Sequence, residues 1–189
     1  MAKTESGPAQ IGMRIPEFEL PDHTGVLHES RTLTGVHGTL VVFLCNHCPF
    51  VKHIAYHLAE MTSELAYTGI RTIGINPNDP GANAEDGTDG MARAIAEYKF
   101  TFPYLVDATG AVARAFGAVC TPDLYLFGPD QSLYYRGQLD DSRPGNGLHV
   151  SGESLRGAVA SMLSMQPPPA DQKVSLGCSI KWPESQAHQ

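Results

Sequence analysis

The pattern of apolar and polar residues predicts strands and helices in a mixed order. Residues 39–44 and 70–76 are apolar runs rich in β-branched residues, which is typical of buried strands. Between them, apolar residues recur at helical spacing from Pro49 to near Gly69, which predicts an amphipathic helix. Its apolar stripe consists of Phe50, Val51, Ile54, Leu58, Met61 and Leu65.

The same reading extends to the second half of the chain. It predicts helices over 91–99, 111–116 and 153–165, a short strand over 104–106, and paired strands over 124–127 and 133–137. Residues 77–90 are rich in Asn, Asp, Gly and Pro and predict a loop, and the prolines at 167–169 end the last helix. This order predicts an α/β fold, a central mixed sheet flanked by helices.

The two ends of the chain are read separately from this core. Residues 16–20 and the turn at 22–25 predict an N-terminal β-hairpin extension, preceded by a mobile arm over 1–13. One domain is expected over 14–165, followed by a C-terminal tail over 166–189. We expect the tail to wrap back onto the domain through the apolar residues Val174, Leu176, Cys178, Ile180 and Trp182.

Composition narrows the classes of function. The 189 residues carry a net charge of −7, and no Lys or Arg run appears, so we expect no nucleic-acid partner. No segment approaches the roughly 20 apolar residues of a membrane helix, and the first 22 residues contain no apolar signal-peptide core. We therefore expect no membrane association and a cytoplasmic location, where four cysteines indicate redox or metal chemistry.

The candidate chemistry centres on Cys45-Asn46-His47-Cys48, between the strand over 39–44 and the helix from Pro49. Cysteines three apart in a first helical turn bring their Cα atoms to roughly 5–6 Å, which suits a disulfide. The helix start stabilises a thiolate, and a protonated His47 would lower the thiol pKa further. We predict that Cys45, nearer the exposed helix tip, is the nucleophile and that Cys48 is the resolving thiol.

A structural zinc site is the alternative use of the pair, and it needs two more ligands. The nearest donors in sequence, His53 and His57, fall roughly 140–180° from Cys48 on the helical wheel. We expect these two histidines to lie on a solvated helix face, so that no metal and no cofactor is predicted.

A second candidate segment is Cys120-Thr121-Pro122, just before the strand over 124–127. Proline is found at strand starts because it cannot donate to a ladder. The bond before such a proline can be cis or trans, and the residues alone leave both open.

Together these segments resemble the thioredoxin-like superfamily: a strand, Cys-x-x-Cys at a helix start, and Thr-Pro before a late strand. The resemblance implies a cis bond between Thr121 and Pro122, with both residues binding substrate, as we also expect of Asn46. With the N-terminal hairpin, the chain is similar to redoxin domains, and most closely to bacterial thioredoxin-family proteins related to alkyl hydroperoxide reductase. The segments that carry this likeness are 45–52, 75–79, 118–123, 135–146 and 177–182.

The resemblance implies a thiol-disulfide oxidoreductase that acts on a protein or small-molecule disulfide and is reduced by a thiol system, as a monomer or homodimer. A peroxiredoxin-like thiol peroxidase with an antioxidant role is one alternative, since Cys48-Pro49 resembles the peroxiredoxin Cys-Pro. The peroxiredoxin pattern Pro-x-x-x-Thr-x-x-Cys fits neither Cys45 nor Cys48, however. A copper- or zinc-binding module using the cysteines and a histidine is another alternative.

Three further residues are candidate auxiliaries. Cys120 is a second resolving thiol, a metal ligand or a small buried residue, and Cys178 packs passively in the tail or pairs with Cys120. Arg136 belongs to a charge-dense stretch that includes Arg143. That stretch is either a surface turn closed by ion pairs or a device that orients an anionic substrate near the thiols.

Overall fold

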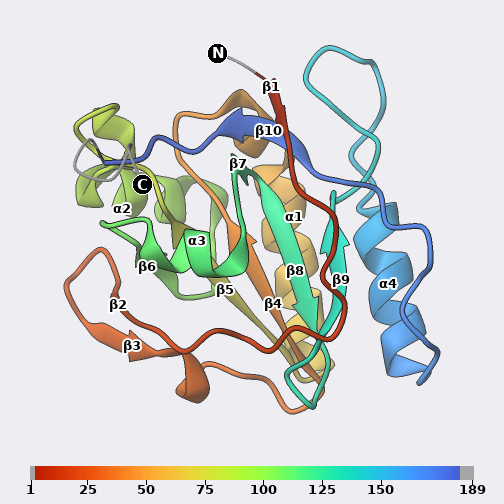
Figure 1. Cartoon of the computed structure of the whole chain (residues 1–189). Helices are drawn as coiled ribbons and strands as arrows, with labels where there is room; N and C mark the ends of the chain where they lie inside the picture. Colours follow the sequence, from red (N-terminus) through yellow and green to blue (C-terminus); the bar gives the residue numbers. More distant parts are fainter. Residues whose placement is uncertain (1–2, 184–189) are drawn as a thin grey trace.

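A five-stranded mixed sheet forms the centre of the structure, a computed structural model that describes residues 3–183 (Figure 1). Its strand order is β6 (Tyr104–Val106), β5 (Ile70–Asn76), β4 (Gly38–Phe43), β8 (Asp123–Phe127) and β9 (Leu133–Gly137). The first three run parallel, and β4, β8 and β9 pair antiparallel. The predicted mixed sheet is confirmed.

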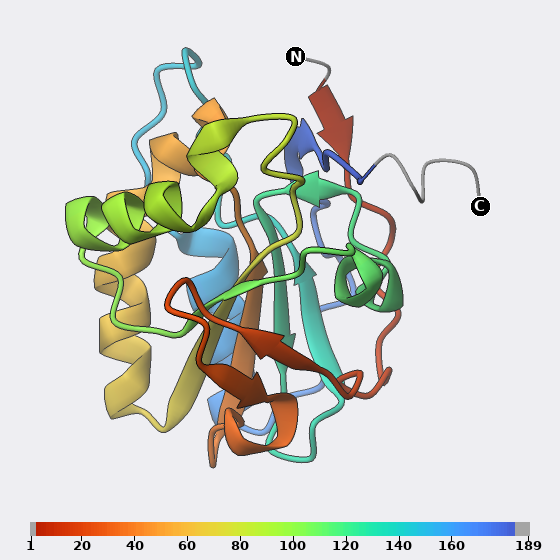
Figure 2. The ribbon, with the colours of Figure 1, turned by 90° about the vertical axis from the view of Figure 1, so that its left-hand side faces the viewer.

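Helices cover both faces of this sheet (Figure 2). The residues of α1 (Pro49–Tyr67), α2 (Thr88–Tyr98) and α4 (Glu153–Leu163) pack in one apolar cluster, and those of α3 (Ala111–Phe116) pack in another. Successive side chains of β4 point to opposite faces of the sheet. Leu40 and Val42 belong to the first cluster, and Val41 and Phe43 belong to the second. This alternation explains why the whole strand is apolar.

Three element boundaries differ from the sequence prediction. The hairpin is formed by β2 (Glu19–Pro21) and β3 (Leu27–Glu29), so its first strand begins at residue 19 instead of 16. The predicted loop over 77–90 contains the short helix η2 (Ala84–Asp86) and the first turn of α2. The last helix ends at Leu163, before a turn in which Met165 has a positive φ.

The expectation of a mobile arm over 1–13 is wrong for the described residues 3–5. They form β1 (Lys3–Glu5), which pairs with β10 (Leu176–Ser179) of the tail, and β10 pairs in turn with β7 (Cys120–Thr121). Pairing satisfies backbone groups that an arm would leave to water. Within the described residues, the tail wraps onto the domain as predicted: Ile180 is buried, and the guanidinium of Arg114 lies 4.5 Å from the centroid of the Trp182 ring. Val174, which the prediction includes in this contact, is exposed, and residues 184–189 of the predicted tail lie outside the described residues.

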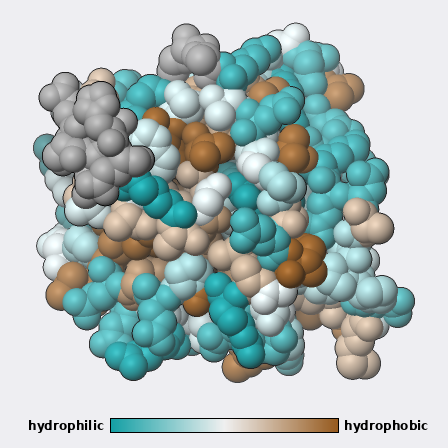
Figure 3. Space-filling view, viewed as in Figure 1, coloured by the Kyte–Doolittle hydropathy of each residue, from teal (hydrophilic) through white to brown (hydrophobic). Residues whose placement is uncertain are grey.

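Apolar side chains are mostly interior. On the face drawn in Figure 3, hydrophobic residues appear as separate patches among hydrophilic ones. Within residues 3–183, no helix combines the length and apolar character needed to cross a bilayer.

Candidate active site

The two cysteines of the Cys-Asn-His-Cys segment follow the end of β4 and precede α1. Cys48 is the N-cap residue of α1, and Pro49 takes the first helical position, so Cys45 lies in the connection before the helix. The sequence-based picture of both thiols in one helical turn, with Cys45 at an exposed tip, is therefore corrected: both cysteines are fully buried. Thr121 of β7 contacts Cys45, and Cys178 of β10 contacts Cys48, so these two strands shield the thiols from solvent.

Cys45 contacts the loop that contains the predicted Thr-Pro. Its Sγ lies 3.0 Å from the hydroxyl oxygen of Thr121. The pKa of Cys45 is raised well above that of a free thiol, mainly because its thiol donates a hydrogen bond to Cys48, and also because it is buried. Cys45 is thus the protonated member of the pair.

The pKa of Cys48 shifts in the opposite direction. This pKa is lowered to about 5, with the hydrogen bond to Cys45 as the largest cause and those to Cys178 and the backbone N–H of Val51 as further causes. The N–H of Val51 is one of the unpaired groups of the helix start. The helix start therefore acts on Cys48, whereas the sequence predicts Cys45 as the nucleophile.

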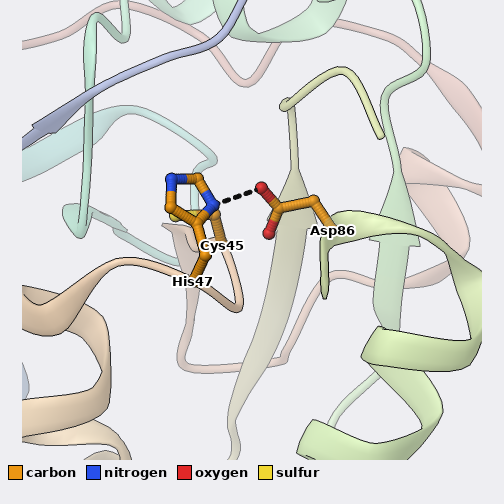
Figure 4. A group of neighbouring side chains, drawn as sticks. All are labelled: Cys45, His47 and Asp86. Carbon is orange, nitrogen blue, oxygen red and sulfur yellow. Dashed lines mark hydrogen bonds and ion pairs between the residues drawn. The ribbon is translucent and has the colours of Figure 1, made fainter. Parts of the chain in front are cut away.

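His47 is held by a carboxylate that the sequence did not single out. Its Nδ1 lies 2.6 Å from Oδ2 of Asp86, and the His47 side chain is only 7% exposed. Asp86 is the last residue of η2 and reaches across to the ring, behind which Cys45 lies (Figure 4). One ligand atom from each of these three residues lies within 4.8 Å of the other two.

A network of amides fixes Asp86 in this position. Its carboxylate accepts hydrogen bonds from the backbone N–H of Asn46 at 2.7 Å and from Nδ2 of Asn78 at 2.9 Å. Asn76 donates to its backbone carbonyl at 3.0 Å. The hydroxyl of Tyr104 donates to Oδ1 of Asn46 at 3.1 Å. Asn46 is thus buried inside this network, and within residues 3–183 no basic side chain other than His47 bonds the Asp86 carboxylate.

Thr121 and Pro122 lie where the resemblance placed them. The peptide bond between them is cis, and the thiol of Cys48, when protonated, donates to the carbonyl oxygen of Thr121 at 3.3 Å. Pro122 also lines a small pocket together with Phe50, Arg143 and Leu176, with a volume of about 20 Å³, enough for one water molecule. A substrate lying across the mouth of this pocket would meet the same loop that contacts both thiols.

Three other candidates, Arg136, Arg143 and Cys120, do not take part in the contacts around Cys45 and Cys48. Arg136 is buried, and its guanidinium bonds Asp123, Pro8 and Gly117, so it is neither in a surface turn nor directed at the thiols. Arg143 closes its turn by donating to the carbonyl oxygens of Asp140 and Ser142. Burial raises the pKa of Cys120 strongly, which keeps it a thiol.

The two helix histidines also differ from expectation. His53 and His57 are half-buried, and the Nε2 atom of each is buried without a hydrogen-bond partner among the described residues. The ring of His57 lies beside Gly152 at the start of α4, which covers this side of α1. A solvated helix face is therefore wrong for both residues.

The donor set also bears on metal binding. Within residues 3–183, Cys45, His47 and Asp86 are the group of three or more Cys, His, Asp or Glu residues whose donor atoms lie close enough to share an ion. The Asp86 oxygens, however, already accept hydrogen bonds from Asn46, His47 and Asn78. As arranged, the three residues form a thiol–imidazole–carboxylate series, in which an imidazole held by a carboxylate can move a proton at the sulfur.

Comparison with known proteins places this site in a family. The chain is similar to an uncharacterized conserved protein from Geobacillus kaustophilus, at 41% identity and a TM-score of 0.94 over 97% of this chain and 98% of that one. It is similar to the hypothetical protein SMc02350 from Sinorhizobium meliloti 1021, at 39% identity and a TM-score of 0.92 over 96% and 99%.

A more distant likeness shows the fold alone: the peroxidoxin BcpB from Mycobacterium tuberculosis, at 20% identity and a TM-score of 0.61 over 82% of this chain and 97% of that one. No curated protein sequence matches. The AhpC/TSA family pattern matches residues 11–136, which include both cysteines and the Thr-Pro loop. The chain is thioredoxin-like and belongs to the AhpC/TSA family.

Proposed function

We propose that this protein is a thiol-disulfide oxidoreductase in which Cys45 and Cys48 cycle between dithiol and disulfide. The observation that supports this most is the position of the two thiols: Cys48 is the N-cap residue of α1, and Thr121 contacts the sulfurs of both Cys45 and Cys48. The lowered pKa of Cys48 agrees with it. A thiolate is the nucleophile in thiol-disulfide exchange. The cis Thr121–Pro122 loop beside both sulfurs supports substrate binding at this point.

The ionisation order bears on the roles of the two cysteines. The sequence predicts Cys45 as nucleophile and Cys48 as resolving thiol, but the thiolate that the contacts favour is Cys48. We therefore propose the opposite order. Because Cys48 is fully buried, the segments that cover it must first move aside. Cys48 then attacks one sulfur of the substrate disulfide, forming a mixed disulfide and releasing one substrate thiolate.

The thiol of Cys45 then loses its proton and attacks Cys48. The Cys45–Cys48 bond forms, and the second substrate thiolate leaves, so that two electrons have passed to the substrate. His47, oriented by Asp86 and near Cys45, takes up the Cys45 proton. A cellular thiol reduces the new disulfide; in the cytoplasm, the location that the sequence predicts, such reductants are abundant.

The test combines thiol counting with trapping. Mild oxidation of the purified protein, followed by alkylation and mass spectrometry, is expected to protect two thiols, and a dithiol reductant is expected to release both. Variants that lack one attacking thiol then separate the roles. A Cys45→Ser/Cys178→Ser protein should retain a substrate mixed disulfide on Cys48, whereas Cys48→Ser should retain little on Cys45. Persistent trapping on Cys45 alone would restore the order predicted from the sequence.

Thiol peroxidase activity is a second candidate, favoured by the low pKa of Cys48 and by the family. The Cys48 thiolate would attack a peroxide oxygen, releasing water or an alcohol and leaving a sulfenic acid that a thiol condenses with. The rate of peroxide consumption with a dithiol reductant decides this candidate. Turnover no faster than that of free cysteine would exclude it.

A further inference from the structure

A third thiol lies against the proposed redox pair. Cys178, on β10 of the tail, has its Sγ 2.7 Å from Sγ of Cys48 and is 1% exposed. A disulfide bond is about 2.05 Å long, so a small approach of the two sulfurs would allow a bond. The register of β10 fixes this position, because Cys178 lies opposite Thr121, the residue that also contacts both thiols of the pair.

We propose that Cys178 is a third redox-active thiol, which exchanges with the Cys45–Cys48 disulfide to give a Cys48–Cys178 disulfide. The inference rests on the proposed function, since it needs the first disulfide to form. It goes beyond that function because it makes the C-terminal tail part of the catalytic cycle, where the sequence predicts passive packing or a pairing of Cys178 with Cys120.

The exchange needs no outside oxidant or reductant. Cys178 gives up its proton, and its sulfur attacks Sγ of Cys48. The bond between Cys48 and Cys178 forms as the bond between Cys48 and Cys45 breaks. The electron pair leaves on the sulfur of Cys45, and this sulfur takes up a proton from His47. The chain as a whole keeps one disulfide, and Cys45 is again a thiol.

The geometry of the three thiols supports this relay. Cys48 lies between its two partners: its Sγ is 2.7 Å from that of Cys178, and it also contacts the thiol of Cys45. Burial and the neighbouring Cys48 raise the pKa of Cys178 to about 12, so Cys178 is protonated in the reduced protein. Because attack requires the ionised sulfur, we expect the exchange to accelerate as the pH rises through the neutral and alkaline range.

Cys120 provides a matched control. It is equally buried, but it lies opposite Ser179 in the strand pairing. Side chains alternate across a strand, so Cys120 and Thr121 point to opposite sides of β7. Cys178 belongs to the same apolar cluster as Cys48, and Cys120 does not.

The test maps disulfides in the full-length protein after oxidation with oxidised glutathione, acid quenching, alkylation and peptide mass spectrometry. In the wild type and in Cys120→Ala, we expect both a Cys45–Cys48 and a Cys48–Cys178 linkage, the second forming faster as the pH is raised. In Cys178→Ala, only the first should remain. A wild-type protein that forms Cys45–Cys48 but never Cys48–Cys178 would overturn this inference while leaving the proposed function intact.

A second variant guards against misfolding of Cys178→Ala. In Cys45→Ser, the only pair in contact is Cys48 with Cys178, and oxidation should protect both from alkylation. Two outcomes contradict the relay. In one, oxidation protects Cys48 and Cys120 from alkylation; in the other, it protects neither Cys48 nor Cys178. Absence of every internal disulfide in the wild type would instead contradict the proposed function itself.

Discussion

At the residue scale, one helix start and one carboxylate define the chemistry. The helix start holds the thiolate of Cys48, and Asp86 holds the ring of His47. The sequence could predict the first because Cys-x-x-Cys, Pro49 and the apolar helical stripe are local signals. It could not predict Asp86, which is 39 residues from His47 and lies in a segment that reads as an ordinary polar loop. Asn76 and Asn78, which bond Asp86, are polar residues following a strand end, and that pattern is the sequence signal that points toward this place.

The ionisation of Cys48 yields a direct pH prediction. Thiolate absorbance in the ultraviolet should titrate with a midpoint near 5 in the reduced protein, and this step should vanish in Cys48→Ser. Because the pKa of the folded state is below that of a free thiol, 9.0, this ionisation stabilises the fold fully above pH 9 and is lost as the pH falls toward 5. A midpoint near that of a free thiol would show that the helix start does not act on Cys48.

The role of Asp86 is tested by Asp86→Asn. The variant should reduce a model disulfide about 100-fold more slowly, because an unoriented imidazole manages the Cys45 proton poorly. Loss of the buried charged acceptor should also lower the free energy of unfolding by about 1–3 kcal/mol. The matched control is Glu85→Gln, whose exposed pair with Lys52 contributes at most about 1 kcal/mol. Equal rates in the two variants would remove Asp86 from the mechanism.

At the element scale, short strands complete the site. The long elements α1, β4 and β5 follow from periodicity, and their boundaries lie close to the predicted ones. By contrast, β1, β7 and β10 have two to four residues each, too few for a periodic signal. Their pairing depends on backbone groups of segments far apart in the sequence. For this reason the sequence predicts a mobile arm over 1–13 and does not predict Cys178 beside Cys48.

Gly177 tests the docking of β10. A Cβ added at this position would overlap the carbonyl oxygen of Thr121, so Gly177→Ala must push β10 away from the cis loop. We expect the free energy of unfolding in urea to fall by about 1–3 kcal/mol. Gly157→Ala, within α4 where a Cβ meets nothing within 4 Å, should instead stabilise by about 0.5–1 kcal/mol. Unchanged stability in Gly177→Ala would mean that β10 is not packed as described.

At the scale of the whole molecule, the buried guanidinium of Arg136 links segments that are far apart in the sequence. Arg136 on β9 pairs with Asp123 on β8 at 3.0 Å and donates to carbonyl oxygens near the N-terminus and at the end of α3. Its guanidinium also lies 4.8 Å from the centroid of the Tyr125 ring. The sequence placed Arg136 in a charge-dense stretch and had no means of showing that the strand is buried on both faces.

Arg136→Met separates this structural role from a role at the thiols. Leaving Asp123 buried without its partner should lower the free energy of unfolding by about 3–5 kcal/mol. The titration midpoint of Cys48 should not move, because Arg136 does not contact it. The exposed pair of Arg156 with Glu64 supplies the control, and Arg156→Met should cost less than about 1 kcal/mol. A shifted Cys48 midpoint in Arg136→Met would return Arg136 to the site.

The central claim, a reversible dithiol formed by Cys45 and Cys48, is tested most directly in a Cys120→Ala/Cys178→Ala protein equilibrated with glutathione redox buffers. Since only two cysteines remain, alkylation followed by mass measurement reports on that pair alone. We predict that both thiols are lost together in one two-electron transition and return when reductant is added. Two thiols that stay alkylatable in every buffer, while the protein remains folded, would contradict the account.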